Sequence, residues 1–517
     1  MKTFVIILFF LLQSQAGLTQ GMVTTYEGKS IDSKILNQPV KYSVILPKDY
    51  YKNEKKYPVV YLLHGLGGYD YTWLEYGRLS QHIDEAVNKK EIQPMIYVMP
   101  EGYRTYYVND YYGKFLYQDM FVKELVPFID ANYRTIRDKE HRATVGFSMG
   151  GFGALILPLK HPEVFSVCVP LSISIRTDDQ YMTEDQTEWD EQWGKLFGGV
   201  GLSGKERITK YYKENSPFHL LNKANLKQFK DLKIFIDNGD DEQTLSKSNE
   251  ALHILMRDLN INHEFRVRNG GHTFEYWRGS LTNGLNFIDD AFNKKTYRGD
   301  ANDLSSDISN VLSLNPNLIN NDEYEILLPE DYNNSLRYYP VIYFMGKFDT
   351  STKSIISNKV ISEIKENKLP PIISVFIDTD AKTSFDSIIL NVKKNYRIRD
   401  GRRFQSLIGF KEGGSKALNY LIKNNDFTSC TVFDADIDIE LLKSLTEDKI
   451  KSLKNTWFFI STTDKSKNYN SNGLTHIIFK EKQIYHEYRV DQGDGNTNWF
   501  LKELSGALDF SQRKIHY

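Results

Sequence analysis

Short apolar runs alternate with amphipathic segments along the first 300 residues of the chain. Apolar runs without polar alternation are typical of strands that are buried on both faces of a parallel sheet. The pattern therefore predicts the α/β fold class, a mostly parallel sheet with helices on both faces. The expected strands are residues 57–63, 96–99, 143–147, 164–171, 233–237 and 263–267, and the expected helices are residues 121–129, 249–259 and 274–292. Residues 23–46 read as short antiparallel strands, and residues 174–230 as a polar, irregular insertion.

A tight turn is expected where the chain reads Gly-Phe-Ser-Met-Gly-Gly, at residues 146–151. The G-x-S-x-G pattern between a strand and a helix is typical of a nucleophile elbow, in which a strained turn exposes the serine hydroxyl. The flanking glycines let the backbone turn and let the helix pack close to the strand. Ser148 is therefore the candidate nucleophile. The alternative is an ordinary glycine-rich turn with an incidental serine.

A candidate base and a candidate acid follow later expected strands. His272 comes after the last of them, behind two glycines, and an acidic cluster at residues 240–242 follows the preceding one. The order Ser…Asp/Glu…His suits a catalytic triad, because a serine hydroxyl needs a base in reach and an acid orients that base. The alternative for His272 is a plain loop histidine.

Backbone N–H groups would have to stabilise the oxyanion that such a serine creates. Met149 directly follows the nucleophile, and the turn at residues 64–68, His-Gly-Leu-Gly-Gly, follows the first buried strand. We expect the N–H groups of Met149 and Leu66 to be the two donors. An ordinary tight turn is the alternative for residues 64–68.

Several motifs in the same order resemble the esterase D / putative esterase family, which includes feruloyl esterases, acetyl xylan esterases, S-formylglutathione hydrolases and the antigen 85 mycolyltransferases. The motifs are YLLHGLGG, ELVPFIDANYRT, GFSMGGFGAL with HPEVF, IDNGDDE and HEFRVRNGGHTFEYW, between residues 26 and 292. The resemblance implies an α/β-hydrolase fold with a cap at residues 174–230, and serine ester chemistry without a cofactor. It implies Ser148 as nucleophile, His272 as base, and Leu66 and Met149 as oxyanion donors.

The acid departs from the family pattern, in which a glycine is followed at the third position by aspartate and then by an apolar pair. Here the third residue after Gly239 is Glu242, and Gln243 and Thr244 stand where the apolar pair is expected. Either Glu242 is the acid, or the loop is shifted and Asp241 serves. We prefer Glu242.

The second half of the chain repeats the first. YSVILPKDY at residues 42–50 returns as YEILLPEDY at 324–332, and HEFRVRNGGH at 263–272 returns as HEYRVDQGDG at 486–495. The elbow GFSMGG returns as GFKEGG, so that Lys411 stands at the serine position and Gly495 at the histidine position. We expect two tandem copies, a catalytic domain at residues 22–297 and a degenerate domain without esterase activity at 301–517. The second copy would bind a glycan or shape the first copy's cleft; a stabilising scaffold is the plainer alternative.

Composition narrows the classes of partner. The formal net charge of −2 gives no reason to expect nucleic acid or an anionic membrane surface. Two cysteines, Cys168 and Cys430, lie in apolar runs and read as buried hydrophobes, and no metal-binding pattern is present. Lys2 and the apolar residues 4–12 predict a signal peptide over residues 1–16, too short to span a membrane, so we expect export to the periplasm or secretion.

The sequence thus predicts an exported serine carboxylic-ester hydrolase that removes feruloyl or acetyl groups from a carbohydrate through an acyl-enzyme. Trp73, Tyr106 and Trp189 lie in loops above the expected site, where aromatic rings could stack on substrate; packing within the cap is the alternative. An acyltransferase or thioesterase of the same fold, and a non-catalytic glycan-binding protein, are the other candidate functions. No cofactor or metal is expected, and the sequence does not fix the oligomeric state.

Overall fold

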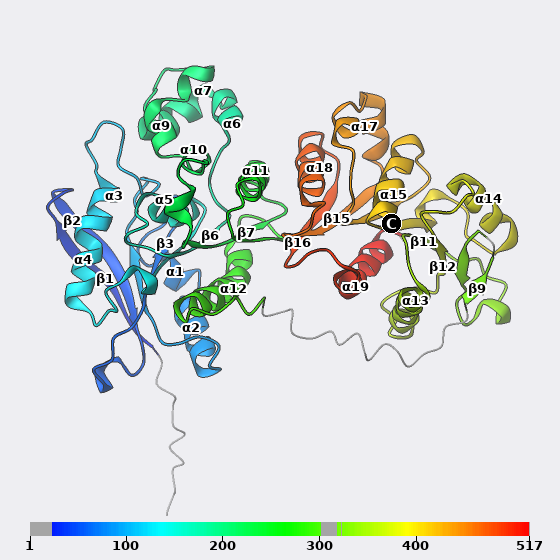
Figure 1. Cartoon of the computed structure of the whole chain (residues 1–517), viewed down its shortest axis with the longest axis horizontal. Coiled ribbons are helices and arrows are strands. Elements are labelled where there is room, and N and C mark those ends of the chain that lie inside the picture. The colour runs from blue at the N-terminus through cyan, green and yellow to red at the C-terminus, as the bar shows by residue number, and fades with distance from the viewer. Residues whose placement is uncertain (1–22, 301–317, 322, 516–517) are drawn as a thin grey trace, which may run out of the picture.

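The computed structural model describes residues 23–300, 318–321 and 323–515 of the 517-residue chain. The expected signal peptide lies outside these residues. One continuous 16-stranded sheet runs through both halves of the molecule (Figure 1). None of the described helices is both long enough and apolar enough to cross a membrane.

The first half contributes eight strands in the order β1-β2-β4-β3-β5-β6-β7-β8. β1 and β2 are antiparallel, and β3 to β8 form a parallel sheet, as the apolar runs predict. Their bounds are β1 (Thr24–Ser33), β2 (Gln38–Leu46), β3 (Val59–Leu63), β4 (Ile96–Pro100), β5 (Arg142–Phe147), β6 (Val167–Leu171), β7 (Lys233–Gly239) and β8 (Glu264–Arg268).

The second half repeats this order as β9-β10-β12-β11-β13-β14-β15-β16. The strands are β9 (Leu318–Asn320), β10 (Glu325–Leu327), β11 (Val341–Met345), β12 (Ile373–Ile377), β13 (Gln405–Phe410), β14 (Ser429–Phe433), β15 (Trp457–Thr463) and β16 (His486–Asp491). The two sets meet at β8 and β16, which are antiparallel through Val267 and Val490.

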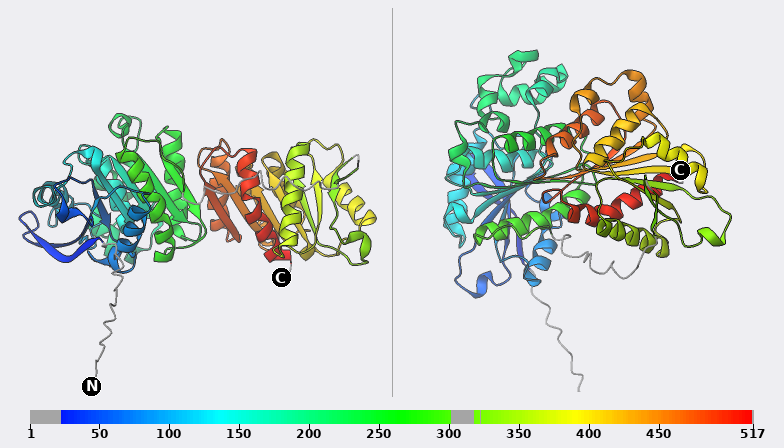
Figure 2. Two further views of the ribbon diagram at one scale, coloured as in Figure 1. Left: turned by 90° about the horizontal axis from the view of Figure 1, so that it is seen from below. Right: turned by 45° about the vertical axis from the view of Figure 1, so that its right-hand side comes forward.

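Helices cover both faces of the sheet in each half (Figure 2). Those of the first half are α1 (Thr72–Glu75), α2 (Leu79–Asn88), α3 (Tyr117–Met120), α4 (Val126–Asn132), α5 (Met149–Lys160), α11 (Thr244–Asp258) and α12 (Phe274–Phe292). Those of the second half are α13 (Thr350–Lys365), α14 (Phe385–Asn395), α15 (Glu412–Lys423), α16 (Ile439–Lys443), α17 (Glu447–Leu453), α18 (Tyr469–Glu481) and α19 (Thr497–Ile515).

The insertion between β6 and β7 is helical rather than irregular, which corrects the sequence interpretation. It contains α6 (Asp178–Thr183), α7 (Gln186–Glu188), α8 (Gly194–Phe197), α9 (Lys210–Glu214) and α10 (Pro217–Leu220), and it stands above the sheet (Figure 1). Each helix is too short to show a repeating apolar face. The corresponding segment of the second half, between β14 and β15, holds only α16 and α17 among the described helices.

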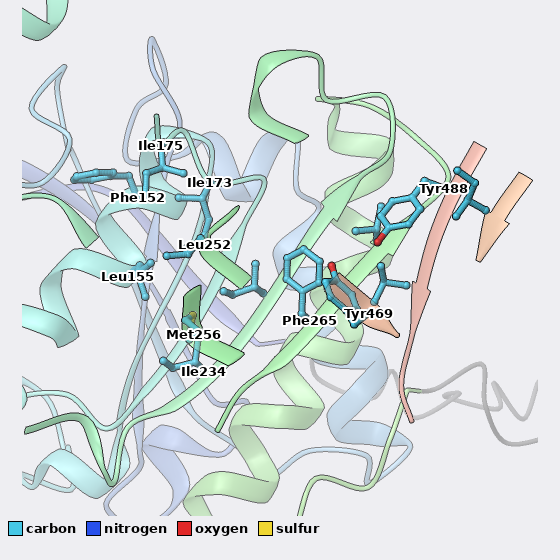
Figure 3. Close-up of a cluster of buried hydrophobic side chains, with 14 of the residues drawn as sticks. Phe152, Leu155, Ile173, Ile175, Ile234, Leu252, Met256, Phe265, Tyr469 and Tyr488 are labelled. Atoms are coloured by element: carbon cyan, nitrogen blue, oxygen red, sulfur yellow. The ribbon is translucent and has the colours of Figure 1, made fainter. Parts of the chain in front are cut away.

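The hydrophobic core is continuous across the junction between the halves. Leu252 and Met256 of α11, Phe265 of β8, and Tyr469 and Tyr488 of the second half belong to one buried cluster (Figure 3). Helix α11 also packs against α18. The halves are therefore joined by strand pairing and by shared apolar burial.

Candidate active site

The serine turn has the strained geometry that the sequence predicts. Ser148, between β5 and α5, has φ 57° and ψ −121°, a backbone conformation that residues other than glycine rarely adopt. A Cβ atom at Gly150 would overlap the carbonyl oxygen of Leu63, and one at Gly146 would overlap the carbonyl of Gly150. Only glycine fits at these two positions, so the elbow is held tight and the Ser148 hydroxyl stands at the carboxyl end of the sheet.

The structure brings together three of the predicted residues. The Nε2 atom of His272 lies 2.9 Å from the Oγ of Ser148, and its Nδ1 lies 2.6 Å from Oε2 of Glu242. The Glu242 side chain is fully buried, whereas His272 is 39% exposed. Asp241, the other candidate acid, is 67% exposed and lies 3.7 Å from the Lys480 ammonium. The hydrogen-bonded series is therefore Ser148, His272 and Glu242.

Two residues that the sequence interpretation missed hold the buried carboxylate. The Ser172 hydroxyl donates to Oε1 of Glu242 at 2.5 Å, and the Trp277 indole N–H donates to the Ser172 oxygen at 2.7 Å. The Trp277 ring also meets the edge of the His272 ring, with centroids 4.9 Å apart. Ser172 directly follows β6. A polar residue at the carboxyl end of a buried strand is the pattern by which the sequence could have indicated this site residue.

The turn after β3 presses against the serine elbow. A Cβ atom at Gly65 would lie 3.3 Å from the Cβ of Ser148. His64 is buried and accepts the Gly102 N–H on Nε2 at 2.7 Å, and the Tyr107 hydroxyl donates to the His64 carbonyl at 3.0 Å. These contacts fix the turn that carries Leu66. Met149 is the first residue of α5, and N–H groups in a first helical turn have no partner within the helix.

A pocket of about 650 Å³ lies between the turn after β3 and the cap. Leu66, Tyr106 and Gln192 line it. The Tyr106 hydroxyl lies 3.2 Å from the Ser174 hydroxyl, and the Ser174 N–H donates to the carbonyl of Ser148 at 3.0 Å. Ser174 thus links Tyr106, which lines the pocket, to the backbone of the candidate nucleophile. Its other lining residues are Gln38, Tyr103, Arg104, Thr105, Val108, Asp110, Phe115, Glu191, Lys195 and Leu196.

The rings of Trp73 and Trp189 are not placed to stack on a substrate, which corrects that expectation. Trp73 is 1% exposed and its indole N–H donates to the Leu63 carbonyl at 3.1 Å. Trp189 is fully buried, with its N–H on the Gly199 carbonyl at 2.7 Å. Both indoles therefore pack inside the protein, and Tyr106 alone of the three lines the pocket.

The matching turn of the second half keeps the backbone but not the side chains. Lys411 has φ 51° and ψ −118°, close to the values of Ser148. Gly495 stands where His272 stands in the first half, and a Cβ atom there would overlap the Asp434 carboxylate.

Among the described residues, no group of three or more His, Cys, Asp or Glu side chains could hold a metal ion.

The parallel sheet, the serine elbow and the histidine after the last parallel strand of the first half define an α/β hydrolase with a serine, histidine and glutamate in hydrogen-bond contact. Residues 33–288 match the model of the family described as "Putative esterase". Just under half of the chain is therefore similar in sequence to that family.

Curated relatives carry esterase names. The chain is 35% identical over 130 residues to an endo-1,4-beta-xylanase/feruloyl esterase of Xylanibacter ruminicola, covering 24% of this chain and 18% of the relative. It is 38% identical over 123 residues to an esterase of Mycobacterium tuberculosis, covering 23% and 26%. The matched segments thus span only 18% and 26% of these relatives' lengths. A solved ferulic acid esterase aligns with 52% of this chain and 99% of its own at 29% identity, with a TM-score of 0.44.

Proposed function

We propose that the protein is a serine carboxylic-ester hydrolase that works through an acyl-enzyme. The observation that carries this proposal is the unbroken hydrogen-bonded series from Ser148 through His272 to the buried Glu242. The match of residues 33–288 to the esterase family model supports the same chemistry.

The geometry suggests a role for each group. His272 takes the proton of Ser148 as Oγ attacks the ester carbonyl, and the buried Glu242 carboxylate stabilises the imidazolium that forms. The N–H groups of Met149 and Leu66 stabilise the oxyanion. As the tetrahedral intermediate collapses, the imidazolium gives its proton to the departing alcohol. Water activated by His272 then attacks the acyl group and restores the free serine.

The pocket that Leu66 and Tyr106 line supports an ester with a bulky group. A volume of about 650 Å³ is in the range of sites for drug-sized ligands, and an acetyl group would leave most of it empty. Its mixture of Tyr106, Leu66 and polar side chains such as Arg104 suits an aromatic ring that carries a hydroxyl. We therefore propose feruloyl-type esters of a carbohydrate as substrates ahead of acetyl esters.

The test compares hydrolysis of methyl ferulate, a chromogenic acetate and a thioester by the chain from residue 17, with two variants. Ser148→Ala should lower kcat by about 10³-fold or more, because removing the nucleophile disables the whole unit. Lys411→Ala, at the matching turn of the second half, should leave kcat unchanged. The feruloyl ester should have the higher kcat/KM of the two esters. Absence of Ser148-dependent hydrolysis of every ester would refute the proposal.

We also propose export, which rests on the basic start and the apolar run at residues 4–12. Mass spectrometry of the protein recovered from its host should find a mature chain that begins at Gly17. Recovery of the intact N-terminus from inside the cell would contradict export.

A further inference from the structure

The second half reaches the loop that carries the acid. Asp240 precedes Glu242 by two residues, and its side chain is 3% exposed. Its Oδ2 atom lies 2.6 Å from Nη1 of Arg489 and accepts the Tyr488 N–H at 3.1 Å. Arg489 and Tyr488 both belong to β16, so the junction strand of the second half binds the Asp240 carboxylate through two hydrogen bonds.

The other oxygen of the same carboxylate reaches the loop that carries the base. Oδ1 of Asp240 accepts the N–H of Gly270 at 3.0 Å, and Gly270 precedes His272 by two residues. The N–H of Asp241 donates to the Gly270 carbonyl at 2.9 Å, and a Cβ atom at Gly239 would overlap that carbonyl. One buried carboxylate thus spans the acid loop and the base loop where the two touch.

Arg489 supplies the charge that this carboxylate needs. Burial raises the pKa of Asp240, and the Arg489 guanidinium opposes that effect. Arg489 is itself 17% exposed, and its Nη2 atom lies 2.9 Å from Glu487 of the same strand. Removal of the guanidinium would leave a buried carboxylate with backbone donors only, which is costly unless the loop shifts or the group binds a proton.

We propose that Arg489 is a positioning residue of the active site, which holds the Glu242 and His272 loops in register through Asp240. This inference rests on the proposed function, and it gives the half that carries Lys411 a role in the chemistry of the other half. Catalysis is sensitive to such placement, because a shift of about 1 Å in a reacting group can cost about 10²-fold in rate.

The junction contains its own control. Asp464 of the second half lies 2.9 Å from Nη1 of Arg266 in β8, and its Oδ1 accepts the Gly493 N–H at 3.0 Å. This pair repeats the Asp240–Arg489 arrangement across the junction. It supports the loop that ends at Gly495, where there is no histidine. Both ion pairs lie in the junction. Asp240–Arg489 lies next to the loops of Glu242 and His272, whereas Asp464–Arg266 lies next to the loop that ends at Gly495.

The experiment measures kcat, KM and the pH profile of kcat/KM for the full mature chain with the ester it hydrolyses best. Arg489→Met should lower kcat by about 10- to 100-fold with little change in KM. The acid limb of the profile should move to lower pH, because a displaced Glu242 stabilises the His272 imidazolium less. Arg489→Lys should recover most of kcat. Asp464→Asn should keep kcat within about twofold of the parent. Its unfolding temperature should fall by about as much as that of Arg489→Met.

The outcomes separate positioning from simple loss of fold. Partial unfolding lowers the rate in proportion to the folded fraction, which circular dichroism measures at each pH. An acid limb that is unmoved in Arg489→Met after correction for this fraction would overturn the proposal. Equal kcat losses in Arg489→Met and Asp464→Asn would also overturn it, because both would then report general loosening of the junction. A parent without Ser148-dependent hydrolysis refutes the proposed function first, and this inference with it.

Discussion

At the scale of single residues, two neighbouring carboxylates have opposite surroundings. Glu242 is buried with one oxygen on His272 and the other on the Ser172 hydroxyl, whereas Asp241 faces solvent near Lys480. A carboxylate that orients a histidine must be fixed, and only Glu242 is held from both sides. An exposed ion pair such as Asp241 with Lys480 contributes little.

This contrast predicts different kinetic effects for two conservative variants. Glu242→Gln should lower kcat by about 10²- to 10⁴-fold, because the amide cannot stabilise the imidazolium and favours the wrong tautomer. Asp241→Asn should retain kcat within about twofold. Steady-state kinetics of ester hydrolysis measures both, and comparable mild losses from the two variants would contradict assignment of a single acid.

The sequence allowed some site residues to be predicted and hid others. Ser148 and His272 stand in local patterns whose glycines and neighbouring strands are visible in the sequence. The Asp240–Arg489 contact joins residues that are 249 positions apart. Both lie in motifs that the sequence shows, but no local pattern indicates that the two side chains meet. Trp73 and Trp189 lie where loops were expected, but local polarity does not reveal which way a side chain in a loop points.

At the scale of elements, the predicted bounds agree fully with the structure for one long helix and less well for another. The expected helix at residues 274–292 is confirmed as α12 (Phe274–Phe292), whose N-cap Thr273 accepts the Tyr276 N–H. α11 begins at Thr244, five residues before its expected start, because its first turn follows the acid loop without an apolar signal. The short helices of the cap carry no such period and escaped prediction.

Glycines in two helices should respond in opposite directions to alanine. Gly150 lies in the first turn of α5, where a Cβ atom would overlap the Leu63 carbonyl, so Gly150→Ala should destabilise by ~3 kcal/mol. Gly506 in α19 is exposed, and an added Cβ atom would meet nothing within 4 Å, so Gly506→Ala should stabilise by about 0.5–1 kcal/mol. Urea unfolding midpoints compare the variants with the parent. A parent-like midpoint for Gly150→Ala would contradict the close packing of the elbow.

At the scale of the whole molecule, the junction buries a carboxyl group without a cationic partner among its described contacts. The Tyr469 hydroxyl donates to Oε2 of Glu250 at 2.5 Å, across the contact between α11 and α18. Burial raises the pKa of Glu250 to about 8. The unfolded chain releases this proton near pH 4.3, so the contribution of Glu250 to folded-state stability should fall as pH rises from about 4.3 to 8.

Glu250→Gln should remove that dependence, because the amide is neutral at every pH. The variant should be more stable than the parent at pH 8, by an amount on the order of a few kcal/mol, and similar to it near pH 5. Thermal unfolding from pH 5 to 8 measures the difference, with Glu188→Gln on the surface of the cap as control. Equal slopes for Glu250→Gln and the parent would show that Glu250 is ionised in the folded protein.

Buried histidines have the opposite effect over an overlapping range of pH. Burial lowers the pKa of His263 and of His486 to about 4. Below about pH 6.5 the unfolded chain gains protons on these histidines that the folded chain does not accept, so their contribution to stability falls as pH decreases to about 4. This acid-side loss should remain in Glu250→Gln.

The antiparallel pairing of β8 with β16 joins two related halves of one chain. This affects how substitutions arise in each half and in what ratio the two halves are made. In a pair of identical subunits, every substitution appears on both sides of the symmetry axis. Here Asp240 and Asp464 occupy related places but are separate positions in one chain, so each can change alone. One covalent chain also supplies the two halves in a fixed one-to-one ratio and at high effective concentration. The turns of the second half, which carry Lys411 and Gly495, can therefore accept substitutions that leave the first half unchanged. The second half nevertheless stays covalently joined to the half that contains Ser148.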